Sequence, residues 1–271
     1  MTITDPTEAR KALITFLRDN APVTVITGAG ISTDSGIPDY RDNKGEWKRT
    51  PPVQHQDYMR SEAVRKRYWA RSLFGWPVLY HAKPNSAHYA IAEFQQQGLI
   101  GCVITQNVDG LHQKAGATRV INLHGYANDM VCMSCREITP RLDMHERSLK
   151  LNPDFAALEA TAAPDGDADL EADFEQFKVA GCRSCGGILK PDVVYFGDNV
   201  PRPRVEEAQK SLENSNALLA IGTSLMVFSG YRFARQAHQS NQPVALLTLG
   251  KTRADELATL KLNCSIKDVL A

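Results

Sequence analysis

Short apolar runs rich in β-branched residues alternate along this chain with segments of helical periodicity. The first run, Val23–Thr27, reads VTVIT and is typical of a strand buried on both faces. Similar runs occur at 101–105, 120–123, 192–196, Ala217–Ile221 and 244–249, and helices are expected at 7–19, 86–97 and 204–215. Strands that alternate with helices predict an α/β fold with a doubly wound, parallel, Rossmann-like sheet.

Two segments interrupt this alternation and are predicted to be insertions. Residues 42–85 are rich in Arg, Tyr and Trp and are expected to form two helices, while residues 126–190 carry four paired cysteines. We therefore expect a Rossmann-like NAD-binding domain made of 1–41, 86–125 and 191–271, a helical insertion at 42–85 and a smaller inserted module at 126–190. Within that module, the acidic segment 162–173 is expected to form an exposed loop or a short helix.

The paired cysteines are the strongest chemical signal in the sequence. Cys132 and Cys135 form one Cys-x-x-Cys turn, and Cys182 and Cys185 form another. Two such turns supply the four thiolates of a tetrahedral site for zinc, Zn(2+), and four protein ligands leave the metal no open position for catalysis. The alternative is four unconnected buried thiols. Because the start of the chain shows no secretory signal, the spacing favours a zinc-binding module over a disulfide framework.

Composition argues against several classes of function. Hydrophobic residues make up 43% of the 271 residues, which argues against wholesale disorder. The 31 Lys and Arg residues balance 31 Asp and Glu residues and are scattered, so binding to nucleic acid or to a membrane surface is not expected. No apolar run approaches the roughly 20 residues of a membrane span, and the start MTITDPTEAR resembles neither a signal peptide nor a transit peptide. We expect a soluble, cytoplasmic monomer.

A glycine-rich loop follows the first strand. Gly28, Ala29, Gly30 and Ser32 stand where backbone N–H groups at the start of a helix could approach the phosphates of a dinucleotide. The third glycine of G-x-G-x-x-G is replaced by Thr33, and no acid is placed to hold a ribose, which counts against a hydride-transfer dehydrogenase. The alternative is a tight turn that binds no ligand.

Polar clusters also follow the ends of other predicted strands. The segments SGIPDYR (35–41), TQNVDGLH (105–112) and LHG (123–125) would border the ligand crevice of an open α/β sheet. Polar side chains from three strand ends are therefore expected to converge on one pocket. Taken singly, Asn107 and Asp109 also fit the role of turn formers, and a lone His124 is more often a structural histidine.

The motifs GAGIS, GIPDYR, TQNVDGLH, LHG, the paired Cys-x-x-Cys, LKPDVVYFGD and GTSLMV occur together in this order. This order resembles that of the sirtuins, the NAD-dependent protein deacylases, over residues 24 to 262. The segments RKRYWARSLFGWP and KTRADELATLKLN are similar to the class II branch, whose animal member is mitochondrial, and the chain resembles a bacterial relative. The resemblance implies a protein lysine deacylase that consumes NAD, releases nicotinamide and forms acyl-ADP-ribose.

The resemblance also implies roles for single residues. His124 matches the general base that takes a proton from a ribose hydroxyl, and the ordinary imidazole pKa of about 6.5 suits this task. Asn107 and Asp109 match catalytic contacts to the nicotinamide ribose, with Asp109 as the candidate to hold the carboxamide. The implied NAD contacts are Gly28, Ala29, Gly30, Ser32, Asp39, Tyr40, Arg41, Gln106, Asn107, Asp109, Gly222, Thr223, Ser224 and Thr248. Tyr40 replaces the commoner Phe, and Thr248 stands where many sirtuins have Asn.

The implied partners are proteins or peptides that carry acylated lysine. Such a peptide is expected to pair as an added strand with Val193, Val194, Phe196 and Gly197 on one side and Val227 on the other. Tyr68 and Arg71 have the Y-x-x-R spacing of sirtuins that favour succinyl and related acids, so the pair would bind the carboxylate of the acyl chain. The alternative places Tyr68 in the core and gives Arg71 a helix-capping or surface role.

Two other functions compete with deacylation. A protein mono-ADP-ribosyltransferase would use the same NAD pocket, but it has no need for His124 as a base aimed at the ribose. A zinc-ribbon binding module would predict a concentrated basic face, and the even spread of charge argues against it.

Overall fold

The computed structural model describes the whole chain except residues 41, 43–45, 47, 49–51, 157, 159–160, 163–167 and 170–171. It divides into two compact units. Unit 1 comprises Met1–Arg49, Lys83–Leu123 and Val200–Ala271, and unit 2 comprises Thr50–Ala82 and His124–Asn199. Among the described helices, none combines the length and the apolar character that a membrane crossing requires.

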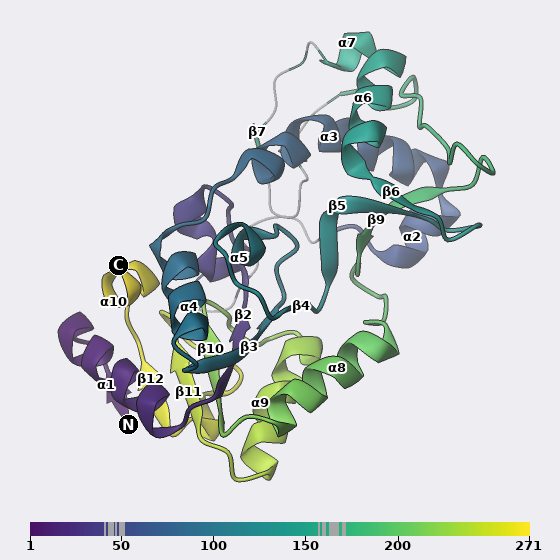
Figure 1. Cartoon of the computed structure of the whole chain (residues 1–271). Helices are drawn as coiled ribbons and strands as arrows, with labels where there is room; N and C mark the ends of the chain where they lie inside the picture. The colour runs from purple at the N-terminus through teal and green to yellow at the C-terminus, as the bar shows by residue number, and fades with distance from the viewer. Residues whose placement is uncertain are drawn as a thin grey trace. The chain divides into compact units, whose positions relative to one another are not determined.

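Unit 1 is built on a seven-stranded parallel sheet (Figure 1). Its strand order is β1-β12-β11-β10-β2-β3-β4. The strands are β1 (Thr2–Ile3), β2 (Val23–Thr27), β3 (Ile100–Thr105), β4 (Val120–Asn122), β10 (Ala217–Ile221), β11 (Val244–Leu247) and β12 (Leu260–Leu262). From β2 the chain proceeds to β3 and β4 on one side and later to β10, β11 and β12 on the other. The winding therefore reverses between β2 and β10, which is the switch point where open α/β sheets bind ligands.

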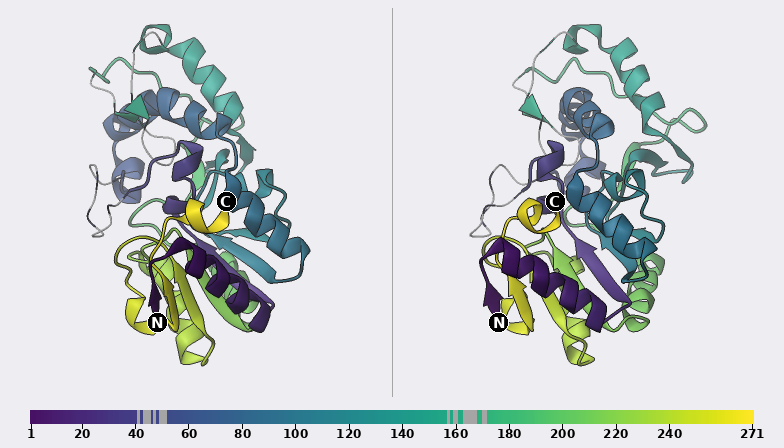
Figure 2. Two further views of the ribbon diagram at one scale, coloured as in Figure 1. Left: turned by 90° about the vertical axis from the view of Figure 1, so that its left-hand side faces the viewer. Right: turned by 60° about the vertical axis from the view of Figure 1, so that its left-hand side comes forward.

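Helices cover both faces of this sheet because alternate side chains of each strand point to opposite faces. On one face α1 (Pro6–Asp19), α4 (Ser86–Gln96) and α10 (Ile266–Leu270) pack on Val25, Val103, Leu219 and Ala245. On the other face α8 (Arg202–Glu213) and α9 (Phe228–Gln239) pack on Ile26, Ile104, Leu218 and Leu246. Figure 2 shows α1 (dark purple) lying along the strands. The doubly wound sheet that the sequence predicted is confirmed.

Unit 2 combines helices with small antiparallel sheets. The helices α2 (His55–Arg60) and α3 (Glu62–His81) confirm the two helices expected within 42–85. The strands β5 (Gly125–Cys132), β6 (Ile138–Pro140) and β9 (Leu189–Val193) form a sheet in the order β6-β5-β9, and α6 (Arg141–Leu151) and α7 (Pro153–Ala156) follow β6. This sheet ends in the four-cysteine cluster, which confirms a smaller cysteine-bearing module in addition to the Rossmann-like sheet.

Two local predictions about strands are wrong. The apolar run at 192–196 was expected to be a strand of the parallel sheet, but the observed strand is β9, which pairs antiparallel with β5 in unit 2. An apolar run cannot by itself specify which sheet it joins. The segment 162–173 was expected to be a loop or short helix, but its described part includes β8 (Ala168–Asp169), which pairs with β7 (Thr161–Ala162). Ala168 is fully buried, and β8 contacts α3, so packing against α3 accounts for the burial of this residue.

Candidate functional site

The loop after β2 lies against the end of β10 in unit 1. The Gly28 N–H donates to the Ile221 carbonyl oxygen (3.3 Å), and the Gly30 N–H donates to that of Gly222 (2.9 Å). A Cβ atom on Gly28 would lie 2.7 Å from Cβ of Thr223, and one on Gly30 would lie 2.9 Å from the Gly222 oxygen. The two glycines therefore permit the close approach of two chain segments at the switch point of the sheet.

The sequence predicted that the glycine-rich loop begins a helix. The structure shows no α-helix there. The loop forms two 3-10 helices, Ala29–Ile31 and Thr33–Ser35. The N–H groups of Ile31 and Ser32 donate to the carbonyl oxygens of Gly28 and Ala29. Together with Gly28 and Gly30, four of the five amides from Gly28 to Ser32 are thus bonded within the chain. Within the described stretch from Gly28 to Ser32, Ala29 is the residue whose amide has no such bond.

Ser32, Asn107 and Asp109 form one hydrogen-bond network at the ends of β2 and β3. Ser32 Oγ donates to Asp109 Oδ2 (2.8 Å) and accepts from Asn107 Nδ2 (3.0 Å). The Asn107 amide also donates to the Gly28 carbonyl oxygen (3.0 Å), and Asp109 Oδ1 accepts from the Leu111 N–H (2.9 Å). Burial raises the pKa of Asp109, while its hydrogen bonds to Leu111 and Ser32 oppose the rise. Asp109 therefore begins the turn into α5 (Leu111–Lys114) and also belongs to the polar network.

Gln106 links the ends of β2, β3 and β10. Its Nε2 donates to the Thr27 carbonyl oxygen (3.2 Å) and to Thr223 Oγ1 (2.9 Å). A Cβ atom on Gly230 would lie 2.5 Å from Gln106 Oε1, so α9 passes close to this side chain. The structure thus brings together the strand-end residues Gly28, Ser32, Gln106, Asn107, Asp109, Gly222 and Thr223 within unit 1.

The remaining expected NAD contacts of unit 1 lie on neighbouring loops. The Ser224 carbonyl oxygen accepts from the Arg253 N–H (2.9 Å), and the Thr248 N–H donates to Leu262 after the end of β11 (3.2 Å). Asp39 pairs with Lys48 (2.6 Å), whose N–H donates to the Tyr40 carbonyl oxygen (2.9 Å). Arg41 lies outside the described residues.

Two buried histidines, His88 and His112, lie close to this network. The sequence analysis did not single them out. His112 Nε2 is 2.9 Å from Thr27 Oγ1, which is bonded to Thr105 Oγ1 (2.9 Å), and Thr105 Oγ1 accepts from the Asn107 N–H (3.1 Å). The His88 ring lies 4.9 Å from the His112 ring. Burial lowers the pKa of His88 to about 4 and that of His112 to about 3, so both rings are neutral at physiological pH. The motif TQNVDGLH contains His112, but periodicity gives no sign of its burial.

His124 is the first residue of the second segment of unit 2. Its carbonyl oxygen accepts from the Val194 N–H (2.8 Å), and the next residue, Gly125, pairs with Val193 in the β5–β9 ladder. Beyond β9, the Phe196 carbonyl oxygen accepts from the His55 N–H (2.9 Å), and that of Gly197 accepts from the Gln56 side chain (2.8 Å). The segment expected to bind peptide is therefore anchored by α2. Val227, on unit 1, is the N-cap of α9 and is 37% exposed.

Tyr68 and Arg71 lie one turn apart on α3. The Tyr68 ring is buried in a cluster with Tyr58 (5.4 Å between ring centres) and Tyr195 (5.7 Å), and burial raises the pKa of both partners. Arg71 Nε donates to the Ala168 carbonyl oxygen and so connects α3 to β8.

The four cysteines of unit 2 form a compact cluster. All four sulfur atoms lie within 4.8 Å of one another, with Cys132 Sγ 3.5 Å from Cys185 Sγ and Cys135 Sγ 3.8 Å from Cys182 Sγ. Zn–S bonds of about 2.3 Å in a regular tetrahedron require sulfur–sulfur distances of about 3.8 Å, so the cluster fits zinc. Glu137, which the sequence analysis missed, accepts from Ser184 Oγ (2.7 Å) and lies 3.4 Å from Cys182 Sγ.

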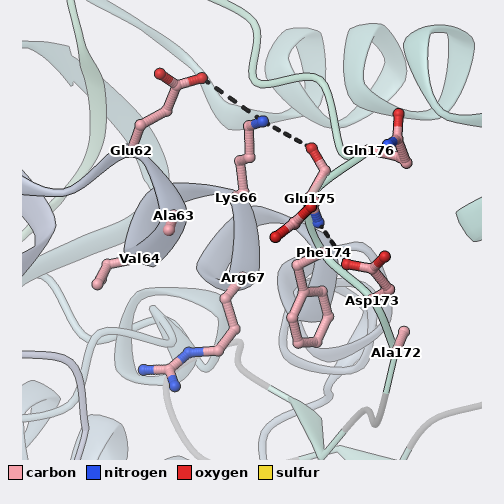
Figure 3. A pocket seen from close by; sticks show the side chains of 10 residues that line it. All are labelled: Glu62, Ala63, Val64, Lys66, Arg67, Ala172, Asp173, Phe174, Glu175 and Gln176. Carbon is pink, nitrogen blue, oxygen red and sulfur yellow. Dashed lines mark hydrogen bonds and ion pairs between the residues drawn. The ribbon is translucent and has the colours of Figure 1, made fainter.

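A separate hollow of about 690 Å³ lies on unit 2 between α3 and residues 172–176 (Figure 3). Its lining consists of Glu62, Ala63, Val64, Lys66, Arg67, Ala172, Asp173, Phe174, Glu175 and Gln176. The Lys66 ammonium donates a hydrogen bond to the Glu175 carbonyl oxygen (2.7 Å) and forms an ion pair with the Glu62 carboxylate (3.8 Å). No residue expected to contact NAD, peptide or zinc lines this hollow.

A family model described as the Sir2 family matches residues 28–229. An NAD-dependent protein deacetylase 2 of Bradyrhizobium diazoefficiens is 51% identical over 97% of both chains, and an NAD-dependent protein deacetylase of Bordetella bronchiseptica is 49% identical over 96% of both. A mitochondrial NAD-dependent protein lipoamidase, sirtuin-4 of Bos taurus, is 45% identical over 98% of this chain and 85% of its own length.

Solved structures show the same fold. A Sir2 complex with a p53 peptide and NAD+ is 28% identical to this chain, with a TM-score of 0.76 over 95% of this chain and 94% of the other. A structure that describes the mechanism and regulation of Sir2 enzymes is 30% identical, with a TM-score of 0.77 over 98% and 96% of the two chains.

Proposed function

The chain belongs to the Sir2 family, the sirtuins, and we propose from this premise that it is an NAD-dependent protein lysine deacylase. It would release nicotinamide, consume one water, free the lysine and transfer its acyl group to ADP-ribose. The observation that carries the proposal is the polar network of Ser32, Asn107 and Asp109 at the switch point of the parallel sheet. The names of the relatives, which are NAD-dependent protein deacetylases, agree with this reaction class.

The network suits a reaction that places positive charge on a sugar. As the bond from the ribose to nicotinamide loosens, positive charge develops on the anomeric carbon, and fixed dipoles and carboxylates nearby stabilise it. Asp109 is held by donors at both oxygens, so its orientation is set before substrate binds. We assign to Asp109 the carboxamide of nicotinamide, and to Gln106 and Asn107 the ribose. Ala29, with its remaining amide, and Gly222 to Ser224 would contact the rest of NAD.

We assign to His124 the role of general base. Its imidazole would accept a proton from a ribose hydroxyl. The hydroxyl oxygen could then attack the former carbonyl carbon of the acyl group. The bond from the Val194 N–H to the carbonyl oxygen of His124 and the pairing of the next residue in the β5–β9 ladder support a fixed position for its backbone. Zinc at Cys132, Cys135, Cys182 and Cys185 would stabilise the end of this sheet, because four thiolates leave the metal no site for substrate.

We further propose, from the Y-x-x-R spacing, that Tyr68 and Arg71 favour acyl groups that end in a carboxylate. Their position on adjacent turns of α3 is compatible with this role. The bond from Arg71 to Ala168 and the burial of Tyr68 support the competing structural role. The preferred acyl group, the cytoplasmic location and the monomeric state stay predictions.

Mass spectrometry of a reaction mixture tests the proposed function. One peptide is prepared with acetyl-, succinyl-, glutaryl- and lipoyl-lysine, the last because one relative is named as a lipoamidase, and each is incubated with NAD and the enzyme. Free lysine together with acyl-ADP-ribose is expected for at least one acyl group. ADP-ribose attached to protein without release of lysine would assign the chain to the mono-ADP-ribosyltransferases instead.

A further inference from the structure

Three arginines surround one exposed phenylalanine on unit 1. The guanidinium carbons of Arg232, Arg235 and Arg253 lie 5.3, 5.3 and 5.9 Å from the centre of the Phe228 ring. Phe228 begins α9, so Arg232 and Arg235 lie on the same helical face at i+4 and i+7. Arg253 approaches from the loop after β11 and also lies over the Tyr231 ring (4.3 Å). We call these three residues and Phe228 the arginine cluster.

No ion pair among the described residues offsets the positive charge of the arginine cluster. None of its arginines has a carboxylate within ion-pair distance in the described chain, and α9 contains no Asp or Glu. Arg253 Nη1 donates to the Met226 carbonyl oxygen (3.1 Å), and Arg232 Nε is buried without an acceptor among the described residues. Stacking on the aromatic ring holds the guanidinium groups in place, but three like charges around one ring repel one another. A bound carboxylate would relieve this repulsion.

The cluster is open to a ligand. Phe228 is 44% exposed although the arginines stack on it. No side chain caps the N-terminus of α9 and no acid lies in its first turn, so the helix dipole also favours a negative group there. The guanidinium fork matches a carboxylate with two parallel hydrogen bonds.

We propose that the arginine cluster binds acidic side chains of the substrate protein beside the acylated lysine. This inference rests on the proposed function, because Val227, the expected peptide-binding residue, directly precedes Phe228. An extended peptide advances about 3.3 Å per residue, so an acid two or three positions from the lysine lies about 7 to 10 Å along the strand. A nucleic acid is the less favoured partner, since the charges of the whole chain balance and the cluster is small.

The test compares acetyl-lysine peptides in which two neighbouring residues are either Glu or Gln. The pair is placed on the N-terminal side of the lysine in one set and on the C-terminal side in the other. We expect Glu to raise kcat/KM by about fivefold on at least one side, mainly through KM, with a smaller gain at high salt. A double variant, Arg232→Gln with Arg235→Gln, should lose the gain and keep the parent rate on the Gln peptides.

Arg18→Gln is the matched control, because Arg18 is an exposed arginine on α1 of the same unit and should leave the gain unchanged. Equal kcat/KM for Glu and Gln peptides, or a gain that persists in the double variant, would overturn the proposal. Binding of labelled single-stranded DNA that the double variant loses, without a charge preference among peptides, would assign the cluster to nucleic acid. If no peptide is turned over, the proposed function fails, and fluorescence anisotropy of the labelled Glu and Gln peptides still decides whether the cluster selects acids.

Discussion

His124 is the residue whose replacement should separate catalysis from binding. Its backbone is held by the main-chain bond to Val194, so His124→Ala should keep the fold. We expect turnover to fall about 10²- to 10⁴-fold, since a general base contributes that much to a rate, while NAD affinity stays near the parent value. Release of free lysine from an acylated peptide and calorimetric titration with NAD measure the two quantities. Deacylation at the parent rate would show that another group acts as the base.

The buried rings of His88 and His112 should make unit 1 sensitive to acid. Their folded pKa values of about 4 and about 3 lie below the ordinary value of about 6.5, so below pH 6.5 the unfolded chain takes up protons that the folded chain excludes. Stability is therefore full above pH 6.5 and falls toward pH 4, by up to about 1.4 kcal/mol per pH unit for each ring. Urea unfolding between pH 7 and pH 5 measures the slope. His112→Gln should flatten the slope and the exposed His238→Gln should not; equal slopes in the parent and His112→Gln would contradict this assignment.

Arg71 tests the choice between acyl recognition and structure. If its guanidinium binds an acyl carboxylate, Arg71→Met should lower turnover of succinyl- and glutaryl-lysine far more than that of acetyl-lysine. If Arg71 acts only through its bond to Ala168, the variant should lose turnover on all acylated peptides to the same extent, and its melting temperature should fall. Steady-state rates on the acyl panel, with a thermal melt of the same samples, distinguish the two results.

At the scale of elements, the β5–β9 ladder depends on Gly125. This residue has φ = 97°, and an added Cβ atom would lie 1.9 Å from the Asp192 carbonyl oxygen on the paired strand. Gly125→Ala should therefore cost more than the roughly 1–3 kcal/mol of a strained backbone, because a clash with main chain is added. Gly116 is a matched control: its φ is 95°, but nothing lies within 4 Å of an added Cβ. Chemical denaturation of both alanine variants should show the larger loss in free energy of unfolding for Gly125→Ala. Equal losses would mean that the strands separate enough to relieve the clash with the main chain.

At the scale of the whole molecule, the two units should respond differently to loss of zinc. Structural zinc sites supply roughly 10–16 kcal/mol of apparent folding free energy, and the cysteines tie β5 to the segment before β9 in unit 2. Chelation, or Cys185→Ser, should abolish amide protection in β5, β6 and β9 and leave β2, β3 and β10 protected. Hydrogen exchange with mass spectrometry gives both readouts, and stoichiometric zinc analysis confirms the removal. A fully active protein without zinc would rule out this role for the metal.

Pattern by itself located most of the parallel sheet and the zinc ligands. Val23–Thr27 and Ala217–Ile221 were predicted with their observed bounds, because a strand buried on both faces needs a continuous apolar run. The cysteine cluster was predictable because Cys-x-x-Cys turns fix the local geometry of two thiolates. The strand-end residues Ser32, Asn107 and Asp109 were named from motifs that follow such runs.

Tertiary structure alone decided which partners these residues have. Sequence could not place β9 in the antiparallel sheet, because an apolar run specifies burial and leaves the pairing strand open. Nor could it show that the amides of Gly28 and Gly30 bond to β10 and the residue after it, or that His112 lies buried against Thr27, since both depend on segments more than 80 residues apart. The arginine cluster likewise exists because α9 and the loop of Arg253 meet in space. Local chemistry is encoded in neighbouring residues, whereas hydrogen bonds and charge compensation depend on contacts that only the folded chain creates.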